Sequence, residues 1–166
     1  MISSAASRSF SQLNEYIITP LTADHINSVC AIERNSFSVP WSNAAFYELL
    51  ENPSAAFFCA LDRDGSVSGY AGLFLVPGDD VYAGNAEIMN IAVRHDRRRC
   101  GIAAALMRRL EEYTVSHGAE TLTLEVRLSN EAARELYRLF GFTAVGVRPS
   151  YYRHPTEDAI LMNKRI

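Results

Sequence analysis

The sequence predicts a domain of the mixed α/β or α+β class, with a mixed sheet of about seven strands and about four helices on its two faces. Three observations support this class. Short runs rich in β-branched and apolar residues are separated by stretches with helical periodicity. Glycine, proline and capping residues stand at the boundaries. The resulting order is strand, two helices, three strands, helix, strand, helix and two strands.

The first part of the chain predicts one strand followed by two helices. The run YIITPL, residues 16–21, is β-branched and apolar and predicts a strand that ends near its proline. Thr22 follows as a candidate N-cap for a helix, because isoleucine and valine recur after it at helical spacing. Ser42 is the candidate N-cap of a second, shorter helix, which Pro53 stops.

The middle of the chain predicts a β-hairpin, a polar loop and a further strand. The runs AAFFCALD (55–62) and VSGYAGLFLV (67–76) flank the pair Asp64-Gly65, which is a hairpin-turn signal. The polar run PGDDVYAGN (77–85) predicts a loop. The next strand is AEIMNIAV (86–93), and we expect Ile88, Asn90 and Ala92 on one face and Glu87, Met89, Ile91 and Val93 on the other.

The last part predicts a helix, a strand, a second helix and two closing strands. The pattern after Gly101 is helical until Gly118, which supplies a left-handed stop. The run TLTLEV predicts a strand whose leucines and valine point inward. Ser129 or Asn130 caps the next helix, which Gly141 ends. The runs FTAVGV and EDAILMN predict the two closing strands.

Composition limits the class of protein. The chain has 166 residues, of which 48% are hydrophobic, and a formal net charge of -3, so we expect a globular domain that binds neither nucleic acid nor membrane. No apolar run approaches the ~20 residues that span a bilayer. The cysteines and histidines are scattered without metal-ligand spacing, so we expect no metal site and reduced thiols.

Residues 1–15, MISSAASRSFSQLNE, are rich in serine and poor in apolar residues. We expect a disordered tail here, followed by a single domain at 16–166. The tail lacks the continuous apolar core of a secretory signal, so we expect a cytoplasmic protein. A transit peptide is the alternative, because Arg8 precedes the only acid, Glu15. Nothing in the sequence requires more than a monomer.

Three consecutive arginines precede a run of glycine and alanine in RRRCGIAAALMRRL, residues 97–110. This stretch lies between a strand that ends near Val93 and a helix that begins near Gly101. A helix N-terminus offers unpaired N–H groups and a partial positive charge, and Arg98 and Arg99 add charge beside it. The small residues let a ligand approach the backbone, so the stretch predicts a pyrophosphate cradle. A solvated run of surface arginines is the alternative.

The spacing within this stretch is more specific than its composition. Arg98, Gly101 and Ala103 fit the coenzyme A signature of the GCN5-related N-acetyltransferases: Gln or Arg, two residues, Gly, one residue, then Gly or Ala. The chain resembles that superfamily. Within it, the segments FSVPWS, MNIAV, LEVRLSNEAARELYRLFGF and RPSYYRHPTEDAILM resemble the bacterial ribosomal-protein-alanine N-acetyltransferases. The similarity extends from about Ile18 to the C-terminus.

The resemblance implies the GNAT fold of that superfamily, with a mixed, mostly antiparallel central sheet, and acetyl-CoA as co-substrate. The pantetheine arm is expected along Ile91, Ala92 and Val93, where it pairs with the backbone like an added strand. Asn130 matches a position that reaches the pantetheine, although a plain helix cap is the alternative. The residues expected around the pyrophosphate are Arg98, Arg99, Cys100, Gly101, Ile102, Ala103 and Ala104.

The implied reaction is the attack of an amine on a thioester, which needs a base for the ammonium proton and an acid for the departing thiolate. The resemblance makes Glu125, in the segment LEVR, the candidate base, with Glu87 on the neighbouring strand as its rival. Tyr137 matches the proton donor, although a tyrosine on an apolar helix stripe is usually a core residue. A backbone N–H near Val93 is expected to hold the developing oxyanion.

The resemblance also implies how an acceptor binds. Tyr151 and Tyr152 match paired tyrosines over the acceptor cleft, and Phe37 and Trp41 either line its other wall or anchor a packed loop. The expected acceptor is the N-terminal α-amine of a protein, in particular the alanine of a small-subunit ribosomal protein. The alternatives are other protein N-termini, a lysine or a small amine, and a module that binds CoA without catalysis.

Overall fold

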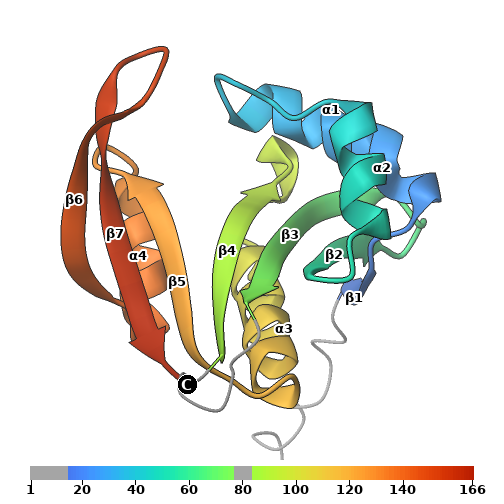
Figure 1. Cartoon of the computed structure of the whole chain (residues 1–166). Coiled ribbons are helices and arrows are strands. Elements are labelled where there is room, and N and C mark those ends of the chain that lie inside the picture. Colours follow the sequence, from blue (N-terminus) through green and yellow to red (C-terminus); the bar gives the residue numbers. More distant parts are fainter. Residues whose placement is uncertain (1–14, 77–83) are drawn as a thin grey trace, which may run out of the picture.

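The computed structural model describes residues 15–76 and 84–166 (Figure 1). The predicted tail before Glu15 and residues 77–83 of the predicted polar loop lie outside the described residues. The strands are β1 (Tyr16–Pro20), β2 (Ala55–Asp62), β3 (Val67–Val76), β4 (Gly84–Val93), β5 (Ala119–Arg127), β6 (Thr143–Tyr152) and β7 (Glu157–Arg165). The helices are α1 (Ile26–Ser36), α2 (Asn43–Glu51), α3 (Ile102–Ser116) and α4 (Glu131–Leu139), with short 3₁₀ turns at Ala23–His25 and His95–Arg97.

The strands form one sheet in the order β1-β2-β3-β4-β5-β7-β6. All neighbouring strands are antiparallel except β4 and β5, which are parallel and connected through α3. The predicted fold class and the predicted order of elements are therefore confirmed.

Helices cover both faces of the sheet, and each face has its own apolar core. On one face α1 and α2 pack against β2 to β4, and on the other α3 and α4 pack against β2 to β5. Each fully buried leucine or isoleucine in such a core contributes about 1.5–3 kcal/mol of transfer free energy. The first core includes Ile26, Val29, Ile32, Phe46, Phe57 and Tyr70, and the second includes Ile102, Leu106, Leu110, Leu122, Val126 and Tyr137.

Two of the predicted N-caps, Ser42 and Asn130, cap their helices, whereas Thr22 precedes the 3₁₀ turn Ala23–His25 and the N-cap of α1 is His25. The Ser42 hydroxyl accepts a hydrogen bond from the Ala45 backbone N–H at the start of α2 (3.2 Å). Asn130, and not Ser129, caps α4, because its Oδ1 accepts from the Ala133 N–H (3.1 Å). Gly118 follows α3 with a φ of +72°, a left-handed conformation that costs little strain only in glycine.

The predicted side-chain alternation along β4 is wrong beyond Ile88. Gly72 of β3 pairs with Asn90 and Leu73 pairs with Ile88, so Met89 is an extra residue in β4. This β-bulge shifts the alternation by one residue. Ile91 and Val93 consequently face the α3 side together with Ile88, whereas Asn90 and Ala92 contact residues on the α1 side.

The two central strands separate along their length. The ladder between β4 and β5 ends at the pair Ile88 and Leu124, while β3 follows β4 to Val93 and β7 follows β5 to Arg127. Figure 1 shows the two parallel strands close together at the end where they begin and far apart where they finish. Beyond Ile88, therefore, the side of β4 that faces β5 carries backbone groups without a ladder partner.

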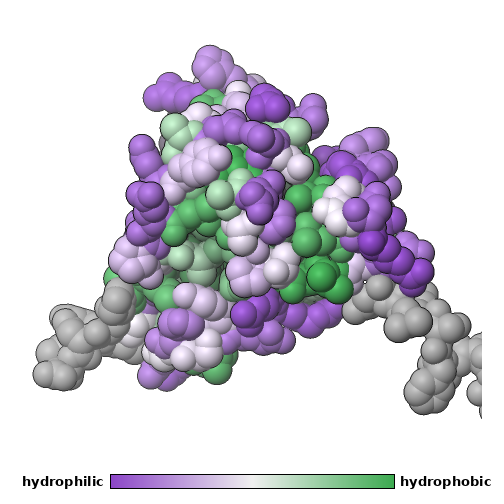
Figure 2. All heavy atoms as spheres, turned by 90° about the vertical axis from the view of Figure 1, so that its right-hand side faces the viewer, coloured by the Kyte–Doolittle hydropathy of each residue, from purple (hydrophilic) through white to green (hydrophobic). Residues whose placement is uncertain are grey.

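Figure 2 shows the side of the molecule over α2 and β1, where apolar residues (green) are exposed between polar residues (purple). The exposed apolar side chains of these two elements include Ile17, Tyr47 and Leu50. Within residues 15–76 and 84–166, no helix combines the length and the apolar character needed to cross a membrane.

Candidate active site

A cavity of about 750 Å³ occupies the gap where β4 and β5 separate. Side chains from α1, α4, both central strands and the segments that follow α1 and β6 line it. It brings together residues that the sequence places far apart. The predicted site residues in its lining are Phe37, Trp41, Glu87, Ile91, Glu125, Asn130, Tyr137, Tyr151 and Tyr152.

Glu125 and Tyr137 reach this cavity from opposite faces of the sheet. Val126 and Tyr137 belong to the core on the α3 and α4 side. Successive side chains of a strand point to opposite faces, so Glu125, next to Val126, points to the other face. A reacting group held in the gap can thus meet a carboxylate on one side and a phenol on the other.

The carboxylate of Glu125 has two polar neighbours on β6. Arg148 forms an ion pair with it, with 2.9 Å between Arg148 Nε and Glu125 Oε1. A hydrogen bond to Glu125, together with burial, raises the pKa of Tyr151 above its ordinary value. The predicted rival, Glu87, is an exposed residue of β4 that lines the same cavity.

Tyr137 is a buried residue of α4 whose ring packs near the ring of Phe142, with 5.9 Å between centroids. Burial raises the pKa of Tyr137 well above its ordinary value. The phenol is therefore fully protonated at neutral pH, as a proton donor must be. Tyr137 is thus both a core residue and part of the cavity wall.

The paired tyrosines differ in burial. Tyr151 is exposed and Tyr152 is half-buried, and their rings meet edge to face at 5.1 Å between centroids. Burial and the nearby charge of Glu125 raise the pKa of Tyr152 to about 12. The guanidinium carbon of Arg127 lies 4.3 Å from the centre of the Tyr152 ring, and this cation–π contact stabilises the position of the ring.

Arg127 connects the two loops that form the rim, a role that the sequence analysis missed. Its guanidinium donates to the Ser38 hydroxyl (3.1 Å) after α1 and to the backbone carbonyls of Arg153 (3.0 Å) and Pro155 (3.2 Å) after β6. It also pairs with Glu157 at 3.2 Å. In the sequence, the position of Arg127 at the end of the segment LEVR is the only feature that indicates this connection.

A buried polar cluster made of Glu33, Tyr70 and Asn90 supports the opposite wall, and the sequence analysis missed it too. Glu33 is only 1% exposed. Its carboxylate accepts hydrogen bonds from the Tyr70 hydroxyl, the Asn90 amide (3.2 Å) and the Trp41 backbone N–H (3.0 Å). Burial raises the pKa of Glu33, and these hydrogen bonds oppose that rise. The cluster joins α1, the β4 bulge and the loop of Trp41.

Trp41 packs against the core as a loop anchor, which is one of the two roles that the sequence analysis considered for it. Its ring packs near Phe46 and Phe57, with centroid distances of 5.7 and 6.2 Å. Both Trp41 and Phe37 also line the cavity. The two interpretations of these residues therefore hold together: they anchor the loop and form a wall.

The N-terminus of α3 has the features of an anion site. Arg99 and Gly101 have φ angles of 63° and 78°, so the chain turns sharply before the helix. The first helical hydrogen bond runs from the Ala105 N–H to the Gly101 carbonyl (3.0 Å). Among the described residues, no side chain caps this helix. The N–H groups of Ile102, Ala103 and Ala104 precede that first bond and are oriented to receive an anion.

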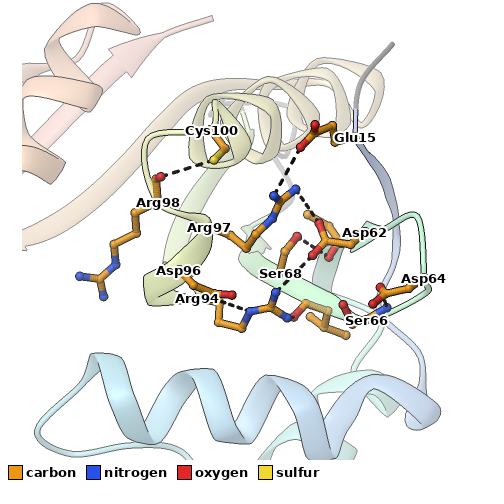
Figure 3. Close-up of polar contacts among 12 residues, drawn as sticks. Glu15, Asp62, Asp64, Ser66, Ser68, Arg94, Asp96, Arg97, Arg98 and Cys100 are labelled. Atoms are coloured by element: carbon orange, nitrogen blue, oxygen red, sulfur yellow. Dashed lines mark hydrogen bonds and ion pairs between the residues drawn. The ribbon is translucent and has the colours of Figure 1, made fainter. Parts of the chain in front are cut away.

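The three consecutive arginines have different roles (Figure 3). Arg97 turns toward the β2–β3 turn, where it pairs with Asp62 (2.9 Å) and Glu15 (3.4 Å). Arg94 binds the same Asp62 at 3.3 Å. Arg98 points away from this group, and its Nε donates to the Val93 carbonyl at 3.3 Å. Arg97 therefore braces the loop, and Arg98 and Arg99 are the residues placed beside the helix N-terminus.

Of the predicted cofactor strand, Ile91 lines the cavity, whereas Ala92 and Val93 lie beyond its lining. Ile91, Ala92 and Val93 pair with β3 on one side, through Ala71, Tyr70 and Gly69. The Ala92 side chain is buried on the α1 side, so only its backbone can contact a ligand. Asn130 lines the cavity while it caps α4, so its two predicted roles are compatible.

Comparison with known proteins defines the class. The sequence profile of the Acetyltransferase (GNAT) family matches residues 26–142, and the chain belongs to that family. It is an acetyltransferase whose fold and central cavity agree with this assignment.

Individual relatives are more specific. A Bacillus subtilis protein named as a putative ribosomal protein bS18-alanine N-acetyltransferase is 39% identical over 140 residues, covering 84% of this chain and 88% of its own length. The Escherichia coli ribosomal protein bS18-alanine N-acetyltransferase is 33% identical over 149 residues, with 87% and 94% covered.

Solved structures agree with the sequence comparison. The crystal structure of the ribosomal-protein-S18-alanine N-acetyltransferase from E. coli superposes with a TM-score of 0.80 at 31% identity, covering 91% of this chain and 94% of the other. Arabidopsis thaliana NAA60 in complex with acetyl-CoA shares the fold, with a TM-score of 0.81 at 17% identity, covering 91% and 98%.

Proposed function

We propose that the protein transfers the acetyl group of acetyl-CoA to the N-terminal α-amine of a protein, and that its acceptor is the N-terminal alanine of ribosomal protein bS18. The observation that carries this proposal is the placement of Glu125 and Tyr137 on opposite sides of one cavity between β4 and β5. We further expect a cytoplasmic protein that acts as a monomer. The named activity of the B. subtilis and E. coli relatives supports the choice of acceptor.

The residues present fit acetyl-CoA. The uncapped N–H groups at the start of α3, with Arg98 and Arg99 beside them, suit a pyrophosphate. The free side of β4 from Ile91 to Val93 suits the amides of a pantetheine arm, which need hydrogen-bond partners. When bound there, acetyl-CoA supplies an acetyl thioester inside the cavity.

Glu125 and Tyr137 then handle the protons of the reaction. Glu125 accepts a proton from the acceptor ammonium, directly or through one water, because an α-amine with a pKa of about 8 is mostly protonated at neutral pH. The neutral amine attacks the thioester carbonyl carbon and forms the N–C bond. The C–S bond then breaks, and the Tyr137 hydroxyl donates its proton to the departing sulfur. The second proton that the nitrogen loses returns through water to the Tyr137 phenolate. A backbone N–H on the free side of β4 stabilises the oxyanion during attack.

The surroundings of Glu125 suit a peptide N-terminus. Tyr151 and Tyr152 form one wall, and Phe37 and Trp41 form the other. Glu87 also lines the cavity, and its negative charge attracts an ammonium group. Aromatic walls around a carboxylate fit an extended peptide better than a small polar amine.

Peptide acetylation tests the proposal. The purified protein is incubated with acetyl-CoA and peptides that begin with the bS18 sequence or with Ala, Ser, Met or Gly, and thiol release and product mass are followed. We expect the alanine peptides to be acetylated fastest, at the α-amine. The matched control is each peptide with a blocked N-terminus, which reports acetylation of lysine. Acetylation of only lysine or small amines would favour those acceptors, and no transfer at all would favour a module that binds CoA without catalysis.

A further inference from the structure

The carboxylate of Glu125 already holds a cation. Arg148 approaches it to 2.9 Å, and the two side chains differ strongly in exposure: 14% for Glu125 and 56% for Arg148. The acid therefore belongs to the cavity wall, whereas the guanidinium reaches it from the solvent side.

Strand register explains how Arg148 reaches across the sheet. Glu125 of β5 pairs with Leu161 of β7, and Leu161 pairs with Gly146 of β6. Residues in register share a face, and so do residues two apart in one strand, so Arg148 lies on the same face as Glu125.

Arg148 stands on a strand that constrains its side chain little. β6 is the last strand in the sheet order, and every residue from Thr143 to Tyr151 is exposed. The guanidinium can therefore leave Glu125 without any backbone movement. In the same conformation the guanidinium carbon lies 5.6 Å from the centre of the Tyr151 ring, a cation–π contact on the solvent side of Glu125.

Among the described residues, Arg148 is the cation that forms an ion pair with Glu125. The other charged or titratable side chains nearby are Tyr151 and Tyr152 of β6, Glu87 of β4 and Arg127 of β5, and the guanidinium of Arg127 pairs with Glu157 instead. In the proposed reaction, the acceptor also arrives as a cation, because its α-amine is mostly protonated at neutral pH. Two cations at one carboxylate repel each other, so the presence of one weakens the binding of the other.

We propose that Arg148 occupies the place of the acceptor ammonium on Glu125, and that a protonated N-terminus binds by displacing it. This exchange rests on the proposed acetylation of protein N-termini. Arg148 is then a specificity-determining residue: it covers Glu125 between turnovers, and it selects acceptors that bring a positive charge. A blocked N-terminus cannot displace the guanidinium.

Steady-state kinetics of Arg148→Gln test the exchange with an alanine peptide as acceptor. Loss of a partly exposed ion pair changes an equilibrium by up to about fivefold, so we expect the KM for the peptide to fall about two- to fivefold and kcat/KM to rise accordingly. Arg148→Lys keeps the competing cation and should keep a KM near that of the unchanged protein. Arg165→Gln is the matched control, because Arg165 is a more exposed arginine that pairs with Glu120 at the far end of β7.

The outcomes separate the two proposals. If the unchanged protein acetylates the peptide but Arg148→Gln has the same KM or a higher one, the exchange is wrong and the acetylation stands. If kcat/KM falls in Arg148→Gln and Arg148→Lys restores it, Arg148 assists the acceptor and does not compete with it. If the unchanged protein acetylates no N-terminus, the proposed function fails and the exchange fails with it. Thermal unfolding of each variant confirms that it is folded.

Discussion

A valine in place of Gly101 tests the phosphate cradle at the start of α3. Gly101 has a φ of +78°, and an added Cβ would meet only the Tyr16 hydroxyl, at 3.5 Å, among the described residues. The protein therefore has space for a side chain, and the cost of the substitution comes from the left-handed backbone. A residue other than glycine in this conformation costs about 1–3 kcal/mol.

Gly118, at the other end of the same helix, supplies the matched control. Its φ is +72°, and an added Cβ would meet no described atom within 4 Å. Gly118→Val carries the same backbone strain but lies far along α3 from the cradle. Both variants should therefore lose about 1–3 kcal/mol of unfolding free energy, and the melting temperature should fall by about 2–4 °C for each kcal/mol.

Only Gly101→Val should also weaken CoA binding, because a side chain there crowds the diphosphate against the backbone N–H groups. Loss of one hydrogen bond to a charged group costs about 1.5–3 kcal/mol, which raises the Kd by about ten- to a hundredfold. Isothermal titration calorimetry with CoA, below the melting temperature of both variants, measures this difference. Equal affinities in Gly101→Val and Gly118→Val would refute the backbone cradle.

Three further predictions concern the cavity and its supports. Glu125→Gln and Tyr137→Phe should each lower kcat by about 10²–10⁴-fold, the usual contribution of an acid or base, with the CoA Kd unchanged by calorimetry. Asp62→Asn removes the partner of Arg94 and Arg97, and we expect a severalfold rise in the KM for acetyl-CoA with the KM for the peptide unaffected. Burial raises the pKa of Glu33, so its contribution to stability is greatest below its unfolded pKa of about 4.3 and is lost as the pH rises through the folded pKa. The unfolding free energy of the unchanged protein should therefore exceed that of Glu33→Gln by more at pH 4 than at pH 8, as measured by urea unfolding.

Each of these predictions has a contrary outcome. Full activity in Glu125→Gln together with inactivity in Glu87→Gln would move the base to β4. An unchanged KM for acetyl-CoA in Asp62→Asn would mean that the ion pairs do not position the cradle. A stability difference for Glu33→Gln that is the same at both pH values would show that Glu33 titrates alike in the folded and unfolded chains.

Much of the fold could be predicted because its signals are local. Helix stripes, the caps Ser42 and Asn130 and the stop Gly118 depend on residues a few positions apart, and the structure has each of them where the sequence places it. The alternation along β4 was predicted wrongly because a bulge depends on how β3 pairs with β4. Neither strand carries a residue that marks Met89 as the extra one.

The candidate site also contains some residues that the sequence indicated and others that only the structure revealed. Sequence resemblance selected Glu125, Tyr137 and the paired tyrosines, and the structure brings them to one cavity, while their catalytic and binding roles stay predictions. Sequence analysis missed Glu33 and Arg148. Glu33 lies beside an apolar helix stripe and finds its partners on β3 and β4, and Arg148 finds its partner two strands away.

The sequence by itself determined the order of helices and strands, the family and the residue types available for chemistry, because periodicity, caps and motifs act over short distances in the chain. Only the tertiary structure decided that β4 and β5 separate after Ile88, that Arg97 turns to Asp62, and that Arg148 covers Glu125. These features depend on register between strands that are distant in sequence, and a pairing of that kind is set by the packing of the whole sheet.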